Sequence, residues 1–234
     1  MDYMNIQFMS TKNKVIIFGN RDLAELAHYY LTKDTDYEVV GFTLNKSYIN
    51  SDFFKPRGSL IEYPLIAFEE LELLFPPNEY YLFAPMTGSK MNLNRKNIYE
   101  EGKKKGYNFI SYISSKATTC DNLIGENCFI LEDNTIQPFT EIGDNVVLWS
   151  GNHIGHHSKI ESHVFFTSHV VLSGNCYVKE RSWFGVNSTI RDGVTIGEGC
   201  LIAMGSLITK STENDSFYMG SPAKKQNKSA IEVY

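Results

Sequence analysis

The sequence predicts two architectures in one chain, a small α/β domain followed by a parallel β-helix. The first prediction rests on short apolar runs that alternate with helical patterns in the front part of the chain. The second rests on an apolar side chain that returns at every sixth position without a slip: Ile124, Ile130, Ile136, Ile142, Leu148, Ile154, Ile160, Phe166, Leu172, Val178, Phe184, Ile190, Ile196, Ile202 and Ile208.

A period of six fits neither a helix, which repeats every 3.6 residues, nor a flat strand, which repeats every second residue. Short straight rungs joined by regular corners produce it, as in a parallel β-helix. Four residues past each apolar anchor the side chain is small or β-branched, as at Cys128, Val146 and Ser158, and can point inward at a tight corner. Three hexads make one coil, so residues 18 apart should stack on one face at a spacing of ~4.8 Å.

Strands and helices alternate before the repeats begin. Buried strands are expected at residues 14–19, 38–43 and 80–84, an amphipathic helix at 23–31 and a polar helix at 94–105. This alternation predicts a parallel sheet, and ligands of such sheets bind at the carboxyl ends of the strands. The first strand ends in a lone glycine rather than GxGxxG, so no nicotinamide cofactor is expected, and the turn also fits plain strand-to-helix geometry.

Length and composition predict a two-domain protein of the cytoplasm. The chain has 234 residues and a net charge of -5, which argues against nucleic-acid binding. No apolar run approaches the ~18 residues of a membrane span, and the opening segment has no signal-peptide pattern. Cys128, Cys176 and Cys200 occupy the inward slot of the repeat and no CxxC is present, so we expect packing thiols in a reducing compartment.

Three segments of the repeat region carry a family resemblance. They are residues 154–160 (IGHHSKI), 184–188 (FGVNS) and 220–224 (GSPAK). With the short α/β domain in front, the chain resembles the sugar O-acyltransferase (sialic-acid O-acetyltransferase-like) family of hexapeptide acyltransferases, which includes bacterial nucleotide-amino-sugar N-acetyltransferases.

The resemblance implies the handedness, the assembly and the ligands. The β-helix should be left-handed, which periodicity alone does not determine. Residues 1–112 should form a Rossmann-like α/β domain that holds the nucleotide of a sugar, and residues 113–234 a β-helix acetyltransferase domain with a C-terminal tail. The protein should be a homotrimer, with acetyl-CoA in the groove between neighbouring β-helices.

The resemblance also assigns the chemistry to two residues. The family's general base maps onto His156, and its backbone N–H contact to the thioester carbonyl maps onto Gly174. They are 18 residues apart in the sequence, so coil stacking independently places them together. A histidine can take the proton that a sugar amine must lose, and a backbone N–H can stabilise the oxyanion. The competing interpretation of His156 is a solvated corner histidine.

Some positions depart from the family pattern. His157 stands where many relatives carry an acidic residue after the base, and Phe165 replaces a second histidine. Trp149 replaces an asparagine, a role that Asn152 or Ser150 could take over. The acidic partner of His156 is therefore unassigned, and the substrate stays open.

Ligand contacts are expected in two regions. The predicted cofactor contacts run along the β-helix to lysines that could meet the phosphates of CoA, and they are Gly174, Gly185, Val186, Ala203, Met204, Gly205, Lys210 and Lys224. The predicted substrate contacts combine strand ends of the front domain with the surroundings of His156, and they are Gly19, Asn20, Arg21, Thr43, Lys90, Asn152 and His157.

Several histidines also raise the question of a metal site. His157, His163 and His169 occupy the same slot of three successive hexads, so they point from three faces about 120° apart and cannot chelate one ion within a subunit. We therefore expect no metal and disfavour a zinc enzyme of the γ-carbonic-anhydrase kind.

The sequence thus predicts an acetyl-CoA-dependent N-acetyltransferase that acts on a nucleotide-linked amino sugar, a dideoxy-amino hexose, for surface glycans such as lipopolysaccharide O-antigen. One alternative is O-acetylation of a sugar hydroxyl, including sialic acid. Another is a trimeric β-helix scaffold without catalytic activity.

Overall fold

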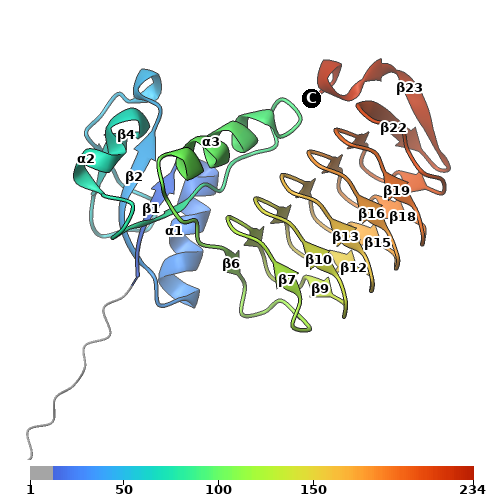
Figure 1. The fold of residues 1–234 in the computed structure, drawn as a ribbon, viewed down its shortest axis with the longest axis horizontal. Helices are drawn as coiled ribbons and strands as arrows, with labels where there is room; N and C mark the ends of the chain where they lie inside the picture. The colour runs from blue at the N-terminus through green and yellow to red at the C-terminus, as the bar shows by residue number, and fades with distance from the viewer. Residues whose placement is uncertain (1–12) are drawn as a thin grey trace, which may run out of the picture.

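The computed structural model describes residues 13–234. An α/β unit lies at one end, a β-helix at the other, and helix α3 (Leu93–Lys104) runs from the first along the second (Figure 1). The opening residues 1–12, where the sequence shows no signal-peptide pattern, lie outside the described part. Within residues 13–234, no helix has both the length and the apolar character needed to cross a membrane.

The front domain is built on a five-stranded sheet in the order β3-β4-β2-β1-β5. Its strands are β1 (Lys14–Phe18), β2 (Glu38–Leu44), β3 (Phe53–Phe54), β4 (Tyr63–Ala67) and β5 (Tyr81–Phe83), and only the β3–β4 pair is antiparallel. Helix α1 (Asp22–Asp34) follows β1, and the short α2 (Leu71–Leu74) follows β4. The predicted strands and helices are confirmed, and β3, β4 and α2 are additional elements that the sequence analysis missed.

The β-helix consists of two-residue strands joined by corners. The strands are β6 (Tyr112–Ile113), β7 (Leu123–Ile124), β8 (Phe129–Ile130), β9 (Thr135–Ile136), β10 (Glu141–Ile142), β11 (Val147–Leu148), β12 (His153–Ile154), β13 (Lys159–Ile160), β14 (Phe165–Phe166), β15 (Val171–Leu172), β16 (Tyr177–Val178), β17 (Trp183–Phe184), β18 (Thr189–Ile190), β19 (Thr195–Ile196), β20 (Leu201–Ile202) and β21 (Leu207–Ile208). They form three parallel sheets that wind as a left-handed solenoid.

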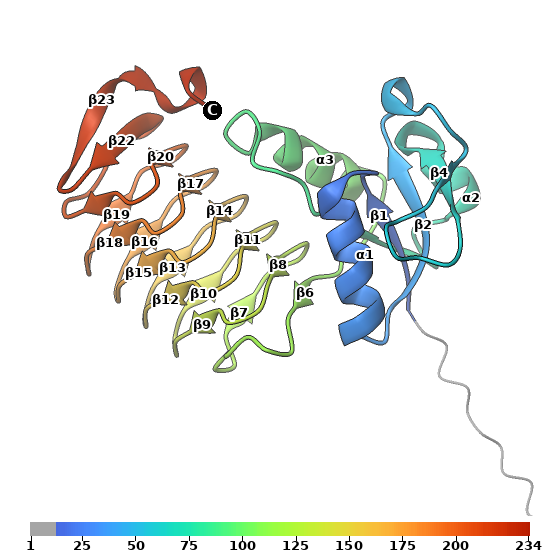
Figure 2. The ribbon, with the colours of Figure 1, turned by 180° about the vertical axis from the view of Figure 1, so that it is seen from behind.

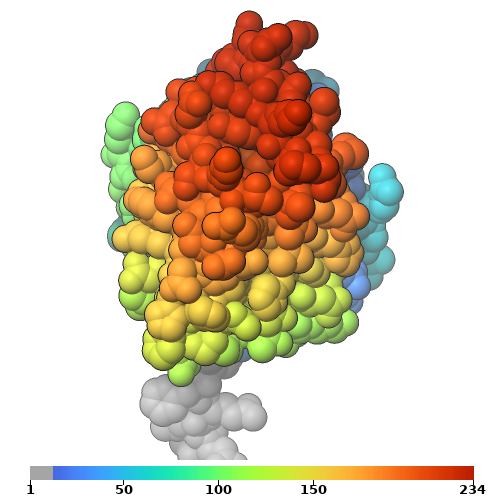
Figure 3. All heavy atoms as spheres, turned by 90° about the vertical axis from the view of Figure 1, so that its right-hand side faces the viewer, coloured from blue at the N-terminus to red at the C-terminus, as the bar shows by residue number. Residues whose placement is uncertain are grey.

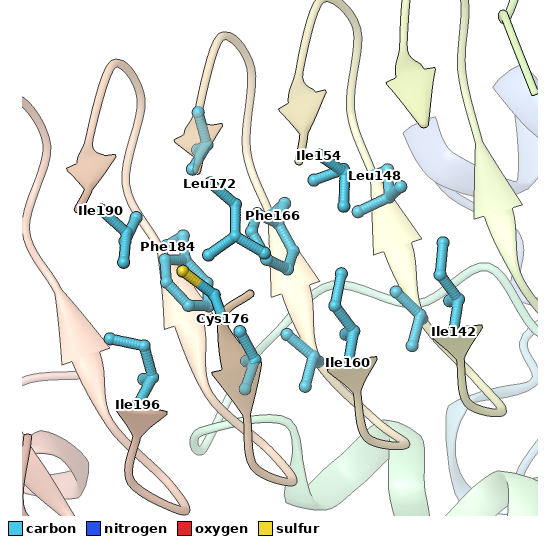
Figure 4. Close-up of a cluster of buried hydrophobic side chains, with 14 of the residues drawn as sticks. Ile142, Leu148, Ile154, Ile160, Phe166, Leu172, Cys176, Phe184, Ile190 and Ile196 are labelled. Carbon is cyan, nitrogen blue, oxygen red and sulfur yellow. The ribbon is translucent and has the colours of Figure 1, made fainter. Parts of the chain in front are cut away.

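Each coil repeats the one before it after 18 residues. Ile154, for example, pairs with Ile136 below and Leu172 above. The anchors of every hexad point into the coil and stack on one another (Figure 4), and Phe166 and Phe184 stack with ring centroids 4.2 Å apart. This core of aligned apolar side chains confirms the fold predicted from the period of six.

Two additions extend the repeat at its ends. Strand β6 joins the sheet of β8 ahead of the first hexad anchor, Ile124. After β21, strand β22 (Ser216–Gly220) continues the same sheet, and β23 (Ala223–Ser229) folds back on β22. The C-terminal residues, which end in the short helix η3 (Ala230–Glu232), lie over the last coils (Figure 3).

The three outer faces of the β-helix differ in character. The sheet of β8, β11, β14 and β17 faces α1 and α3 (Figure 2), and its outward residues Phe129, Val147 and Phe165 are buried with Leu31 of α1 in one core. We call it the covered face. Its outward positions are apolar at 18-residue intervals, which is the sequence signal for a second layer.

The other two faces carry no part of the front domain's core. The sheet of β7, β10, β13, β16 and β19, which we call the charged face, bears the Glu141–Lys159 ion pair at 3.4 Å. The sheet of β9, β12, β15, β18 and β21, which we call the neutral face, has no charged carboxylate, lysine or arginine among its outward residues, which are Thr135, His153, Val171, Thr189 and Leu207.

Polar contacts fix the front domain on the β-helix. The Ala84 N–H donates to Asn127 Oδ1 at 2.8 Å, and Asn92 Nδ2 donates to the carbonyl of Arg181 at 3.0 Å. Arg95 is only 1% exposed at this seam, where it donates to the carbonyl of Val164. Burial lowers the pKa of Arg95 to about 9. The two parts therefore meet through a desolvated and partly polar interface rather than a flexible linker.

Candidate functional site

His156 lies at the corner that follows β12, and the corner is fixed by backbone groups. Its N–H donates to Gln137 Oε1 at 2.9 Å, and its carbonyl accepts from the Asn175 N–H at 2.8 Å. The side chain is exposed. These contacts tie His156 to the coils below and above, so its position depends on the repeat rather than on a loop.

The structure brings His156 and Gly174 together as predicted. A Cβ placed on Gly174 would lie 2.7 Å from His156 Cε1 and 2.8 Å from Nε2, so a side chain at this position would displace the imidazole. Among residues 13–234, no backbone carbonyl accepts from the Gly174 N–H, while its carbonyl accepts from Gly193 at 3.0 Å. A free N–H therefore lies beside a histidine ring, as an acyl-transfer site requires.

His157 occupies the place of the missing acidic partner. Its Nδ1 lies 3.0 Å from Nδ1 of His156, with the two rings at 87°. His157 has a left-handed backbone, φ 56°, and its ring packs on Phe139 with centroids 4.7 Å apart. If His156 Nδ1–H donates to His157 Nδ1, then Nε2 of His156 keeps its lone pair and can accept a proton. A neutral histidine can thus orient the base as a carboxylate does in other sites.

The predicted cofactor residues fall on two corners. The His156 corner consists of His156, Gly174, Asp192 and Lys210, which follow one another at 18-residue intervals along successive coils. The second corner precedes the neutral-face strands, and we call it the His169 corner. It contains Gly151, His169, Gly185, Val186, Ala203, Met204 and Gly205.

The His169 corner is close-packed and partly apolar. A Cβ on Gly185 would lie 2.3 Å from the Met204 nitrogen, and Met204 and Val186 are 75% and 39% exposed. The neutral face separates this corner from the His156 corner, so one subunit does not line a single groove with both. Lys224 lies exposed on β23, where it pairs with Met219.

A pocket of about 560 Å³ lies at the carboxyl ends of the front-domain strands. The predicted contacts Gly19, Asn20 and Arg21 line it, and Arg21 is exposed at the N-terminus of α1. The end of β1 and the first turn of α1 supply further lining residues, and the rest come from the end of β2 and the segments after β2 and β5. They are Phe18, Asp22, Leu23, Ala24, Leu44, Tyr48, Asn50, Pro85, Met86 and Thr87. The pocket thus lies at the strand ends from which substrate contacts were predicted, whereas Tyr48 and Asn50 could not be chosen by strand position alone.

Three predicted substrate residues lie elsewhere. Thr43 is fully buried and its hydroxyl donates to the carbonyl of Ile66 at 2.9 Å, so it belongs to the sheet core. Asn152 is 1% exposed inside the coil, where Oδ1 accepts from the Val170 N–H at 2.7 Å and Nδ2 donates to the carbonyl of Trp149. Lys90 is exposed in the loop before α3 but does not line the pocket.

His163 and three of the cysteines have structural surroundings. His163 is buried at the seam and its Nδ1 accepts from Asn145 Nδ2 at 2.9 Å, and burial lowers its pKa to about 3. Cys128, Cys176 and Cys200 are buried inside the coil as predicted, and burial raises their pKa. In residues 13–234 no group of three histidine, cysteine or acidic side chains is arranged to hold a metal ion.

Comparison with known families identifies the repeat. Residues 123–156 and 175–210 match the family described as bacterial transferase hexapeptide (six repeats). The β-helix therefore carries this hexapeptide repeat over two stretches, which together make up less than a third of the chain.

Curated relatives match short stretches of the chain. A probable macrolide acetyltransferase from Lysinibacillus sphaericus is 45% identical over 53 residues, which are 23% of this chain and 29% of that protein. A putative acetyltransferase from Staphylococcus aureus (strain COL) is 38% identical over 52 residues, 22% of this chain and 26% of that protein. The chain thus matches less than a third of the length of these two relatives.

Solved structures share the whole architecture. The acetyltransferase domain of PglB from Neisseria gonorrhoeae has a TM-score of 0.79 at 19% identity, over 92% of this chain and all of that one. PerB from Caulobacter crescentus, in complex with CoA and GDP-perosamine, also has a TM-score of 0.79 at 19% identity, over 92% of this chain and 98% of that one. At this identity the likeness establishes the fold, an α/β domain joined to a hexapeptide β-helix.

Proposed function

We propose that this protein is an acetyl-CoA-dependent N-acetyltransferase that acts on a nucleotide-linked amino sugar. The observation that carries the proposal is the His156 ring packed beside Gly174, whose N–H donates to no backbone carbonyl of residues 13–234. The amine nitrogen attacks the thioester carbonyl, and His156 Nε2 takes up the proton that the amine loses. The Gly174 N–H donates to the oxyanion. The carbon–sulfur bond then breaks, and His156 returns the proton to the CoA thiolate.

The front pocket is the proposed site for the nucleotide half of the acceptor. It opens at the carboxyl ends of β1 and β2, where parallel sheets bind ligands. The N-terminus of α1 and the exposed Arg21 offer positive potential to a diphosphate in a protein of net charge -5. The complex of PerB with GDP-perosamine supports an acceptor of this class, and we propose a dideoxy-amino hexose destined for surface glycans.

A homotrimer would supply the cofactor groove. The covered face is occupied by the front domain and the charged face is suited to water, which leaves the neutral face for contact with other copies. If three neutral faces turn toward a threefold axis, the His156 corner of each subunit meets the His169 corner of the next. The two sets of predicted cofactor residues then face each other across one groove. Since the reaction consumes acetyl-CoA, we place the enzyme in the cytoplasm.

A thiol-release assay tests the reaction class. The protein is incubated with acetyl-CoA and a panel of nucleotide-linked amino sugars, the matching sugars without the amine, and sialic acid. Free CoA produced only with amino sugars is the expected result. Release with sialic acid or amine-free sugars would indicate O-acetylation instead. A protein that releases no CoA with any acceptor, yet sediments as a trimer, would support the scaffold.

A further inference from the structure

We propose that His169 of the neighbouring subunit completes the transfer site begun by His156 and Gly174, where it binds the acceptor sugar. The inference rests on the proposed trimeric acetyltransferase and adds a residue to its site. Neither the motif around His156 nor the departures from the family pattern point to His169.

The ring of His169 is held as the ring of His156 is held. A Cβ on Gly151, one coil below, would lie 2.5 Å from His169 Nδ1 and 2.6 Å from Cε1. The His169 N–H donates to the carbonyl of Ser150 at 3.1 Å, and the side chain is exposed. Each corner that borders the neutral face therefore presents an exposed imidazole packed on a glycine, and a side chain in place of either glycine would displace the ring.

The two imidazoles meet only between subunits. His156 and His169 lie on opposite sides of the neutral face within one chain. A threefold axis parallel to the β-helix leaves the height of every residue unchanged in the next subunit. His169 is 13 residues after His156, which corresponds to about 3.5 Å of rise at ~4.8 Å per coil.

The directions of the two side chains reduce this difference further. The His156 ring reaches up to Gly174 in the next coil, whereas the His169 ring reaches down to Gly151 in the preceding coil. The rings therefore lie in the same layer, within about one strand spacing (~4.8 Å) of equal height, on the two walls of the groove.

The position along the groove assigns His169 to the acceptor. The predicted cofactor contacts Val186 and Met204 lie one and two coils above the His169 level on the same corner. The coils below are nearer the start of the β-helix, where β6 connects it to the front domain. CoA thus takes the upper part of the groove, and His169 lies where the sugar enters from below.

Steady-state kinetics of His169→Asn test the binding role. Asparagine tolerates the left-handed backbone of this position, φ 58°, so the corner should be retained. We expect the acceptor KM to rise roughly tenfold while the acetyl-CoA KM stays unchanged. The matched control is Asp133→Asn. Asp133 is exposed, has a left-handed backbone and lies two coils lower in the same corner slot. We expect this variant to keep the wild-type KM values for the acceptor and for acetyl-CoA. Unaltered kinetics in His169→Asn would overturn the inference.

Mixed trimers show whether His169 acts across the interface. Differently tagged His156→Asn and His169→Asn chains are coexpressed, and trimers that carry both tags are isolated. In either mixed composition one groove pairs an intact His156 with an intact His169, so about a third of wild-type activity should return at low acceptor concentration. Activity no greater than that of the two homotrimers would place both histidines in a site within one chain and refute the proposal. A wild-type protein without amino-sugar acetylation would instead refute the proposed function.

Discussion

The β-helix and the front domain position their candidate residues by different means. His156 and Gly174 are adjacent because a parallel ladder stacks each residue on the one 18 positions earlier, as the pairing of Ile154 with Leu172 shows. The front pocket instead collects Arg21, Tyr48 and Thr87 from three separate segments after different strands. In the β-helix one substitution therefore acts on a fixed stack, whereas the shape of the front pocket depends on residues from several loops.

The largest effect should come from breaking the stack itself. Phe166→Ala removes a fully buried ring that stacks on Phe184 at a centroid distance of 4.2 Å. We expect the free energy of unfolding to fall by about 3–5 kcal/mol, because the coils above and below are too regular to close the cavity. Urea unfolding measures the loss. Leu73→Ala in α2, where the side chain is 82% exposed, should change it by less than ~0.5 kcal/mol.

The next effect tests the His156 corner, where the fold should survive and the chemistry should not. His156→Asn is expected to lower kcat by roughly 10² or more, the usual scale for loss of a general base, with acetyl-CoA binding and assembly retained. Stopped assays measure kcat, and calorimetry measures CoA binding, so the loss of chemistry can be separated from a loss of cofactor binding. Near-wild-type kcat at neutral pH would mean that the amine loses its proton to water, and the role of His156 would have to be abandoned.

Sequence alone predicted the β-helix residue by residue. The period of six located every anchor, and the spacing of 18 put His156 beside Gly174, because the ladder leaves no other register. The spacing also put Asn152 at an inward slot, where the structure has it. Its assignment as a substrate contact came from the family pattern instead, and the structure contradicts that assignment because the buried amide bonds the Val170 N–H and the Trp149 carbonyl. The covered face has its own sequence signal, because its outward residues Phe129, Val147 and Phe165 are apolar. They recur every 18 residues, so a search for the period of six does not detect them.

In the front domain the sequence predicted elements rather than contacts. The pocket lies at the carboxyl ends of β1, β2 and β5, where parallel-sheet geometry predicts ligand sites. Thr43 failed as a ligand because alternation along β2 turns its hydroxyl to the carbonyl of Ile66. Tyr48 and Asn50 belong to the pocket through the path of a loop, which no periodicity encodes.

A third prediction concerns the seam between the two parts. Burial lowers the pKa of His163 from 6.5 to about 3, so the folded protein binds this proton less readily than the unfolded chain. Stability should be complete above about pH 6.5 and should fall as the pH drops toward 3, by up to about 1.4 kcal/mol per unit. Unfolding at pH 7 and pH 5 is compared in wild type and His163→Asn, whose side chain tolerates the left-handed φ of 65°. An equal loss between the two pH values in both proteins would show that other groups cause the acid sensitivity.

The smallest effect separates the pocket from its surroundings in the front domain. Arg21 lines the pocket at the N-terminus of α1, whereas Lys90 is exposed outside it, although both were expected to bind the acceptor. Arg21→Ala should raise the acceptor KM about tenfold with kcat retained, because it removes binding to the diphosphate rather than chemistry. Lys90→Ala should raise it clearly less. Initial rates over a range of acceptor concentrations measure the KM of both variants. The bare nucleoside diphosphate serves as a competitive inhibitor, and we expect its affinity to fall only in Arg21→Ala. If the Lys90 variant loses more affinity than the Arg21 variant, the diphosphate lies along the loop before α3, and the 560 Å³ pocket is not the nucleotide site.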